Sequence, residues 1–206
     1  MTSPPQVYLA SGSPRRRELL AQIGLQFALL EVDVPECQTH DESAANFARR
    51  LALSKARAGR QLLADADAPV LGADTVVVVA GRTLGKPRDR ADALDMLERL
   101  SGRTHEVLTA VALVGAAERV CLSTSRVRLR TITAAEREAY WATGEPRDKA
   151  GGYAIQGRAA VFVTALEGSY SGVMGLPLFE TAEMLREQGV DLWHAGDSPR
   201  SHGQGI

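Results

Sequence analysis

Hydrophobic and polar positions along the chain follow two different periods, which together predict an α/β protein. Period-two alternation and short apolar runs indicate strands at residues 7–10, 27–34, 70–79, 82–84, 106–114, 120–131 and 159–166. The strongest signal is 70–79, where residues 76–79 are four consecutive valines, a run typical of a buried strand. Within 120–131 arginines alternate with apolar residues, so one face of that strand is expected to be solvated.

Amphipathic segments with helix start and stop signals lie between these strands. Helices are expected from Pro14 to a cap at Gly24, over 42–63, from a cap at Asp89 to Leu100, from Thr133 to about Trp141, and over 177–188. Ser13 and Pro14 form a favourable helix start, and Thr133 with Glu136 three residues later forms a capping box. A Gly-rich stretch at 150–157 precedes the last expected strand.

Composition narrows the class of protein without naming its activity. The chain has 206 residues, 45% of them hydrophobic and 24% charged, which fits one globular domain or one domain with two lobes. Its formal net charge is −1, so no general basic field favours nucleic acid. A site for an anion must therefore come from local clusters of Arg and Lys.

Several other classes lack their sequence signals. Cys37 and Cys121 have no paired spacing, which predicts two reduced cytosolic thiols rather than a disulfide or a zinc site. The four histidines are scattered, and no Walker A loop or dinucleotide fingerprint is recognisable. Neither a signal peptide nor a membrane span is expected from this sequence. Residues 197–206 are expected to be disordered because they offer little to bury.

The turn Ser11-Gly12-Ser13-Pro14-Arg15-Arg16-Arg17 predicts a site for a polyanion. It places three arginines in the first turn of a helix, where the helix dipole is already positive. Each misplaced cation costs about 0.3–1 kcal/mol unless an anion compensates it. Backbone N–H groups and guanidinium groups at such a helix start bind phosphates well. The alternative is that the arginines are simply solvated on a surface turn. We would favour that interpretation for a single Arg, but for three behind a Ser-Pro cap we favour the anion site.

Asp74 is a carboxylate inside the apolar strand 70–79. By period two it shares a face with Gly72 and Val76, whereas Thr75 points to the opposite face. Burying it unpaired would be costly, so it either pairs with a cation or metal or marks a pocket. Ion pairing with Lys86 or an arginine competes nearly evenly with a role in binding Mg²⁺ or in accepting a proton from water.

The remaining candidates are individually weak. Lys86 is presented between Gly85 and Pro87, and Lys55 and Lys149 are further cations, although lone lysines are usually solvated. Asp33 and Glu36 can help to hold a divalent ion or form an exposed acidic loop. Gln156 can recognise a base edge from its Gly-rich stretch or simply satisfy a turn.

At these clusters the sequence resembles the Maf family of nucleoside triphosphate pyrophosphatases. Each motif alone is weak, but together, in the family's order from about Tyr8 to Val190, they are highly specific. They are Leu9-Ala10-Ser11-Gly12-Ser13-Pro14-Arg15-Arg16, Leu71-Gly72-Ala73-Asp74-Thr75, Gly85-Lys86-Pro87, Leu100-Ser101-Gly102, Asp148-Lys149-Ala150-Gly151, Ile155-Gln156-Gly157 and Gly175-Leu176-Pro177.

The resemblance implies both a fold and an activity. The implied fold is α/β, an elongated mixed sheet flanked by helices with two lobes and a central cleft, as in Maf and ITPase-like proteins. Residues 1–192 would form this single domain and 193–206 a flexible tail. The implied activity is hydrolysis of a nucleoside triphosphate to the monophosphate and pyrophosphate with a divalent cation (Mg²⁺, Mn²⁺ or Co²⁺). The protein would be a cytoplasmic homodimer without nucleic acid or membrane partners.

The resemblance also assigns roles to residues. The position of the general base is Asp74. The implied phosphate contacts are Ser11, Arg15, Arg16, Lys55 and Lys86; the specificity positions are Arg15, Thr75 and Gln156; the metal positions are Glu36 and Asp74. No role is implied for Arg17. The Asp-Thr and Ile-Gln-Gly motifs resemble the branch that prefers dTTP and UTP over the branch that acts on 7-methyl-GTP, and house-cleaning of modified nucleotides is a compatible role.

The sequence departs from the family pattern at three places. Pro35 stands where some members carry another acid, Gly152 and Ala154 exchange two small residues, and the chain after Leu192 matches nothing.

A free aspartate has a pKa of about 3.9, so Asp74 would need a metal to acidify the attacking water. Two rival functions stay open: a nucleotide-binding regulator of septum formation and cell division with little catalysis, and a phosphomonoesterase.

Overall fold

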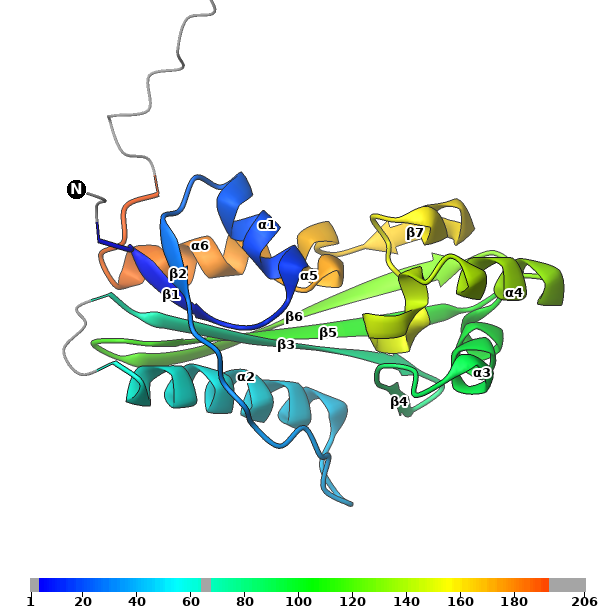
Figure 1. Ribbon diagram of the computed structural model, residues 1–206, viewed down its shortest axis with the longest axis horizontal. Helices are drawn as coiled ribbons and strands as arrows, with labels where there is room; N and C mark the ends of the chain where they lie inside the picture. The colour runs from blue at the N-terminus through cyan, green and yellow to red at the C-terminus, as the bar shows by residue number, and fades with distance from the viewer. Residues whose placement is uncertain (1–3, 64–67, 193–206) are drawn as a thin grey trace, which may run out of the picture.

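The computed structural model describes residues 4–63 and 68–192, in which a mixed sheet runs the length of the molecule (Figure 1). Its strands are β1 (Val7–Ala10), β2 (Phe27–Leu29), β3 (Val70–Val79), β4 (Arg82–Leu84), β5 (Thr104–Val114), β6 (Glu118–Leu129) and β7 (Val163–Glu167). The order is β2-β1-β3-β5-β6-β7, and β4 pairs with β3 off this path. The strand β1 is parallel to β2 and β3, whereas all the other pairings are antiparallel.

Helices cover both faces of the sheet. They are α1 (Pro14–Gln22), α2 (Ala44–Gln61), α3 (Arg90–Leu100), α4 (Ala134–Ala142), α5 (Tyr170–Met174) and α6 (Leu178–Glu187), with the 3₁₀ helices η1 (Glu145–Asp148), η2 (Ala150–Gly152) and η3 (Arg158–Phe162). The long helix α2 lies on one face, and α1, α5 and α6 lie on the other (Figure 1). At the end of the sheet that carries β4, α3 packs against α4.

Among the residues that the structure describes, the apolar core consists of three clusters, which lie at different places along the one sheet and form its two lobes. One cluster, which includes Leu9, Leu19 and Leu185, lies between the sheet and helices α1 and α6. A second, which includes Leu51 and Val76, lies under α2. A third, which includes Leu97, lies at the end where α3 and α4 meet. The long strands β3, β5 and β6 run through both ends, which confirms the expected α/β fold with an elongated mixed sheet and two lobes.

Most predicted elements are confirmed, and the exceptions have physical reasons. The strand expected at 27–34 is only Phe27–Leu29, because its partner β1 has four residues and its register runs from Val7↔Phe27 to Leu9↔Leu29. The strand expected at 159–166 begins at Val163, because residues 158–162 form η3 instead. The short helix α5, which Ser169 caps through the Gly172 N–H, was not predicted.

The predicted caps are largely confirmed. The Asp89 carboxylate accepts a hydrogen bond from the Asp92 N–H, and Thr133 and Glu136 form the capping box. Ser13 occupies the N-cap of α1, but its side chain makes no capping bond. Within the described residues, none of the helices has the length and apolar character needed to cross a membrane. The predicted tail at 193–206 lies outside the described residues.

Candidate active site

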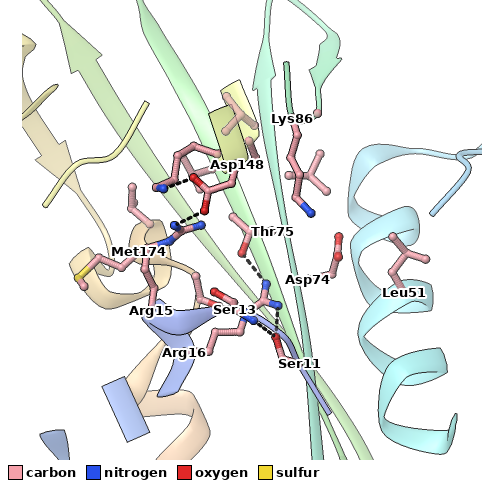
Figure 2. A pocket seen from close by; sticks show the side chains of 18 of the residues that line it. Ser11, Ser13, Arg15, Arg16, Leu51, Asp74, Thr75, Lys86, Asp148 and Met174 are labelled. Atoms are coloured by element: carbon pink, nitrogen blue, oxygen red, sulfur yellow. Dashed lines mark hydrogen bonds and ion pairs between the residues drawn. The ribbon is translucent and has the colours of Figure 1, made fainter. Parts of the chain in front are cut away.

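The candidate site forms where one edge of β3 has a gap between its neighbours. The strand β1 pairs with residues 70–72 and β4 with residues 77–79, and in the described parts of the chain no strand pairs with 73–76 on that edge. Asp74 and Thr75 lie in this gap. Their side chains point to opposite sides of the strand, as period two requires (Figure 2).

A cleft of about 510 Å³ opens at this gap, and both lobes line it. That volume is within the range of ordinary small-molecule sites. Residues from β1, α1 and α2 form one side, and residues from the loop after β4, from η1 and η2 and from the Gly-rich stretch form the other. Every residue to which the family resemblance gave a role lines the cleft: Ser11, Arg15, Arg16, Glu36, Lys55, Asp74, Thr75, Lys86 and Gln156.

Asp74 is held by a lysine from the long helix. The Lys55 Nζ lies 2.8 Å from Asp74 Oδ1 and 2.5 Å from Glu36 Oε1. Helix α2 can approach this closely because Gly72 has no side chain, since a Cβ there would collide with the Ala52 carbonyl. Of the two interpretations left open for Asp74, ion pairing is therefore observed, but with Lys55 and not with Lys86 or an arginine as that interpretation had named. The packing of α2 against β3 determines this partner, and no local sequence pattern indicates that packing.

The buried position of Asp74 changes its acidity. Only 8% of the residue is exposed, and this burial raises the pKa of its carboxyl above the ordinary value, although Lys55 opposes the shift. Burial also acts to raise the pKa of Glu36, but the hydrogen bond and charge of Lys55 outweigh it and leave that pKa below its usual value. Asp74 is therefore a stronger base than a solvated aspartate.

Arg16 is a buried guanidinium bonded to neutral groups. It donates from Nε to the Gly175 carbonyl at 2.8 Å, from NH1 to Ser11 Oγ at 3.0 Å and from NH2 to Thr75 Oγ1 at 3.3 Å. Burial lowers its pKa, and the charge of Asp74 partly compensates. Among the described residues no carboxylate lies within ion-pair distance of Arg16, so an anion in the cleft would satisfy a buried positive charge.

Arg15 connects the two sides of the cleft. Its NH1 lies 3.4 Å from Asp148 Oδ2, and Asp148 also pairs with Lys149 (Figure 2). Figure 2 also shows the Lys86 ammonium extending into the cleft toward Asp74. Arg17 does not line the cleft, so the three predicted arginines separate into two that face it and one that does not.

Two carboxylates of the cleft could contribute to holding a divalent cation whose coordination would be completed by substrate phosphates and water. No group of three or more His, Cys, Asp or Glu side chains is arranged for a metal within the described ranges 4–63 and 68–192. Glu36 and Asp74 nevertheless converge on one point, since both bind Lys55 Nζ. Mg²⁺ is commonly held by one or two carboxylates together with substrate phosphates and water. Asp33 is not part of the cleft lining.

Sequence reasoning missed Asp148 and the apolar part of the cleft. Asp148 was noted only as part of a family motif and was given no role. It bonds to Arg15, which lies 133 residues away in the sequence. The apolar lining includes Leu51, Tyr153 and Met174. The one local signal was the Gly-rich stretch itself, where Gly151 has a φ of 70° and donates its N–H to the Gly85 carbonyl. That bond joins the stretch to the Lys86 loop.

Comparison with known proteins gives consistent matches. The model of a family described as "Maf-like protein" matches residues 6–188. The dTTP/UTP pyrophosphatase of Alkalilimnicola ehrlichii is 60% identical over 191 residues, which is 91% of this chain and 95% of that protein. The dTTP/UTP pyrophosphatase of Saccharophagus degradans is 54% identical over 91% of this chain and 90% of that protein.

Solved structures give a weaker likeness. The Staphylococcus aureus Ham1 protein has a TM-score of 0.43 and 16% identity, over 60% of this chain and 71% of that one. A nucleoside-triphosphatase, or dITP/XTP pyrophosphatase, from Mycobacterium abscessus has a TM-score of 0.37 and 21% identity, over 67% of this chain and 93% of that one.

Proposed function

The chain belongs to the Maf-like protein family, and we propose from this premise that it hydrolyses dTTP and UTP to the nucleoside monophosphate and pyrophosphate. The observation that carries the proposal is the pairing of a buried Asp74 with Lys55 in a cleft that Arg15 and Arg16 also line. The enzyme is thus a hydrolase acting on a phosphoric anhydride. Catalysis would lie in residues 1–192, as one domain.

The cations of the cleft bind the triphosphate in this proposal. Arg15 and Arg16 face the cleft from α1 and Lys86 faces it from the loop after β4, while the first turn of α1 offers backbone N–H groups to phosphate oxygens. Ser11 supports Arg16, whose buried charge favours an anion nearby. Preorganised charges of this kind supply much of the rate enhancement in phosphoryl transfer.

Asp74 accepts the proton of the attacking water. Lys55 holds its Oδ1, which fixes the carboxylate and leaves Oδ2 as the proton acceptor. Glu36 and Asp74 would also hold the divalent cation (Mg²⁺, Mn²⁺ or Co²⁺), which when bound neutralises phosphate charge and makes a bound water more acidic. The pKa of Asp74 is raised by burial, which suits a base better than the pKa of an exposed aspartate.

Three residues select the base in this proposal. Gln156 is exposed at the cleft and offers an amide that can both donate to and accept from a pyrimidine edge. Thr75 acts through its hydroxyl, which accepts from Arg16 and lies 3.0 Å from Thr109 Oγ1. Arg15 contributes from α1, on the side of the cleft opposite Gln156, and its guanidinium reaches across to Asp148.

We also propose that the protein works as a cytoplasmic homodimer on free nucleotides, without nucleic acid or membrane partners. A net charge of −1 supports the lack of a nucleic-acid surface. Light scattering coupled to gel filtration tests the dimer, because a single species at the monomer mass would contradict it.

A panel of canonical and modified nucleoside triphosphates, with pyrophosphate and orthophosphate measured separately, tests the reaction. We expect one pyrophosphate and one UMP or dTMP per turnover, with no orthophosphate. A phosphomonoesterase would release orthophosphate, and a nucleotide-binding regulator would bind without forming product. Either result contradicts the proposal. Reaction in ¹⁸O-labelled water then locates the attacked phosphorus, because the label appears in the monophosphate or in the pyrophosphate.

A further inference from the structure

Gln156 lies in a tight turn that is fastened at both ends. The turn is closed by a hydrogen bond from the Gly157 N–H to the Ala154 carbonyl at 3.0 Å. At its beginning, the Ala154 N–H donates to the Tyr140 hydroxyl at 3.1 Å. Directly after its end, the Arg158 N–H donates to Glu145 Oε2 at 3.0 Å. Both fastening points come from outside the turn.

Tyr140 and Glu145 form one unit. The Tyr140 hydroxyl donates to Glu145 Oε1 at 2.7 Å, so the two groups that hold the turn are themselves bonded. Tyr140 is only 4% exposed, and its ring packs edge-to-face on Phe162 with centroids 5.6 Å apart. A buried phenol at the end of α4 is therefore a rigid reference point for a turn whose key side chain is exposed.

The ionisation of the pair suits this role. Burial, and next the hydrogen bond to Glu145, raise the pKa of Tyr140, so its hydroxyl keeps the proton that it donates. Burial acts to raise the pKa of Glu145, but the bonds from the Arg158 N–H and the Tyr140 hydroxyl outweigh it, and the carboxylate stays charged. The carboxylate also accepts from the Ala159 N–H at 3.4 Å, at the start of η3.

Gly157 shows how closely the carboxylate approaches the turn. A Cβ at this position would lie 2.5 Å from Glu145 Cδ, which real Cβ atoms do not tolerate. The absence of a side chain at Gly157 thus lets the Glu145 carboxylate pack directly against the backbone that follows Gln156.

We propose that Tyr140 and Glu145 are positioning residues for substrate selection, which hold the turn so that Gln156 meets the pyrimidine edge. The inference rests on the proposed function, because it assumes that Gln156 recognises the base. Neither residue lines the cleft, so both act through the turn and not by touching the nucleotide. Loosening the turn should therefore reduce discrimination between bases while the triphosphate contacts remain.

The variant Tyr140→Phe tests this, since it keeps the ring but removes the hydroxyl that joins Ala154 to Glu145. UTP and CTP are a matched pair of probes because they share ribose and triphosphate and differ at the base edge. We expect the wild-type preference in kcat/KM for UTP over CTP to fall about tenfold, mostly through the KM for UTP, with kcat for UTP within about threefold of wild type. Glu145→Gln, which keeps an acceptor oxygen, should retain more of the preference than Glu145→Ala.

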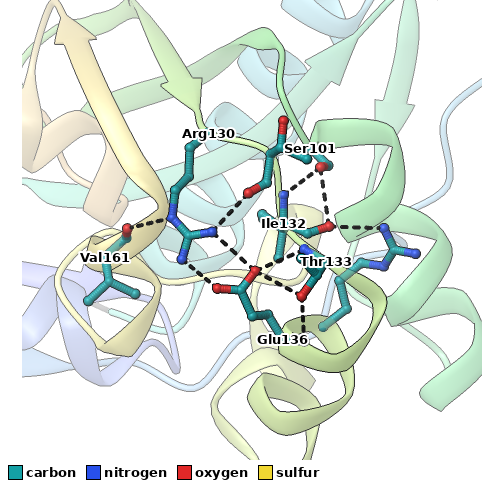
Figure 3. A network of polar contacts seen from close by, with 8 residues as sticks. Ser101, Arg130, Ile132, Thr133, Glu136 and Val161 are labelled. Atoms are coloured by element: carbon teal, nitrogen blue, oxygen red, sulfur yellow. Dashed lines mark hydrogen bonds and ion pairs between the residues drawn. The ribbon is translucent and has the colours of Figure 1, made fainter.

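Thr133→Ala is the structural control, because it weakens the same helix α4 from its other end. Thr133 belongs to the capping box with Glu136, which Arg130 also binds (Figure 3). We expect it to lower the melting temperature at least as much as Tyr140→Phe while leaving the UTP/CTP preference unchanged. A preference within twofold of wild type in Tyr140→Phe, or an equal loss in Thr133→Ala, would overturn the proposal.

Dissociation constants for UTP and CTP, measured by calorimetry on the same variants, separate the two hypotheses. A wild-type protein that binds UTP selectively but releases no pyrophosphate contradicts the proposed function only, and the selectivity of binding still tests Tyr140. A wild-type protein without preference between UTP and CTP overturns the positioning role directly.

Discussion

The Lys55 ammonium lies 2.8 Å from the Asp74 carboxylate, and both residues are more than nine-tenths buried. The pair joins helix α2 to the gap in β3, so it is at once a structural contact and the setting of the proposed base. Burial raises the pKa of Asp74, and Lys55 limits that rise. The lysine therefore determines the pH below which Asp74 is protonated and cannot act.

Replacing Lys55 by methionine should move the acidic limb of the pH–rate profile to higher pH. A cation within 4–6 Å lowers a carboxyl pKa by about one to three units, so its loss should move the limb upward by a shift of that order. The sign follows because activity is lost as pH falls through the pKa of the base, and that pKa rises. Kinetics of kcat/KM from pH 4 to 9 measure the shift.

Lys86→Met is the matched control for this shift, because Lys86 lines the cleft but is not bonded to Asp74. It should weaken nucleotide binding and leave the acidic limb in place. An unmoved limb in Lys55→Met would mean that Asp74 is not the group that the profile reports.

Replacing Asp74 by asparagine should abolish most turnover without abolishing binding. Positioned general bases contribute about 10²- to 10⁴-fold, so kcat should fall by that factor. Asparagine preserves the shape of the side chain, and Glu36 remains as a partner of Lys55. Calorimetric titration with UTP should still give a measurable dissociation constant. Turnover at the wild-type rate in this variant would remove Asp74 from the mechanism.

Adding a methyl group at Gly72 should damage stability and activity together. An alanine Cβ would meet the Ala52 carbonyl and lie 2.6 Å from the Ala56 nitrogen, so α2 would have to move, and Lys55 with it. Overpacking of this kind costs about 1–3 kcal/mol, and sometimes more. Urea denaturation measures the loss of unfolding free energy, and kcat reports the displacement of Lys55.

Gly85→Ala provides the comparison, because nothing lies within 4 Å of the Cβ that it would add. Its unfolding free energy should stay within about 0.5 kcal/mol of wild type. If Gly72→Ala were equally mild, the close approach of α2 would not be what holds Lys55 in place.

The boundaries of β3 and the opposite directions of Asp74 and Thr75 were predictable, because both follow from local periodicity. The four valines at 76–79 mark a buried strand, and period two fixes the faces. The end of β2 was not predictable in the same way, since the length of its partner β1 decides where the pairing stops. The residue types within 27–34 do not indicate how long the neighbouring strand β1 is.

Motifs predicted most of the polar residues that line the cleft, but they did not predict which of these residues form ion pairs or hydrogen bonds with each other. Lys55 and Asp74 lie 19 residues apart, and Arg15 and Asp148 lie 133 apart. These pairs depend on how α2 and η1 are placed by the folded core. The fastening of the Gln156 turn by Tyr140 and Glu145 was missed for the same reason. Motifs therefore identify the members of a site more readily than the contacts that tune it.

Arg15 and Arg17 allow a charge-matched test of the helix start. Both lie in the first turn of α1, but only Arg15 lines the cleft. Losing a charged hydrogen bond costs about 1.5–3 kcal/mol, so Arg15→Gln should raise the KM for UTP by roughly 10- to 100-fold. Arg17→Gln removes the same charge from the same turn and should change KM less than threefold. Equal increases in both variants would show that only the general positive charge matters.

His105 should make the protein less stable in mild acid. It is 2% exposed, its Nε2 lies 2.7 Å from the Tyr153 hydroxyl, and its Nδ1 has no hydrogen-bond partner in the described structure. Burial lowers the pKa of His105 to about 4, so the folded protein excludes a proton that the unfolded chain binds below about pH 6.5. Between these values the unfolded state holds more protons, and stability therefore rises with pH.

Replacing His105 by glutamine should remove this dependence while keeping a polar partner for Tyr153. As pH falls from about 6.5 to about 4, wild type should lose roughly 3 kcal/mol of unfolding free energy relative to the variant, which corresponds to about 1.4 kcal/mol for each pH unit. Urea denaturation at several pH values measures the difference. Tyr153→Phe keeps the histidine and should keep the wild-type slope, because burial rather than the tyrosine causes the shift. Parallel curves of unfolding free energy against pH for wild type and His105→Gln would show that the imidazole is protonated in the folded protein. That result would contradict the prediction that the buried His105 is neutral.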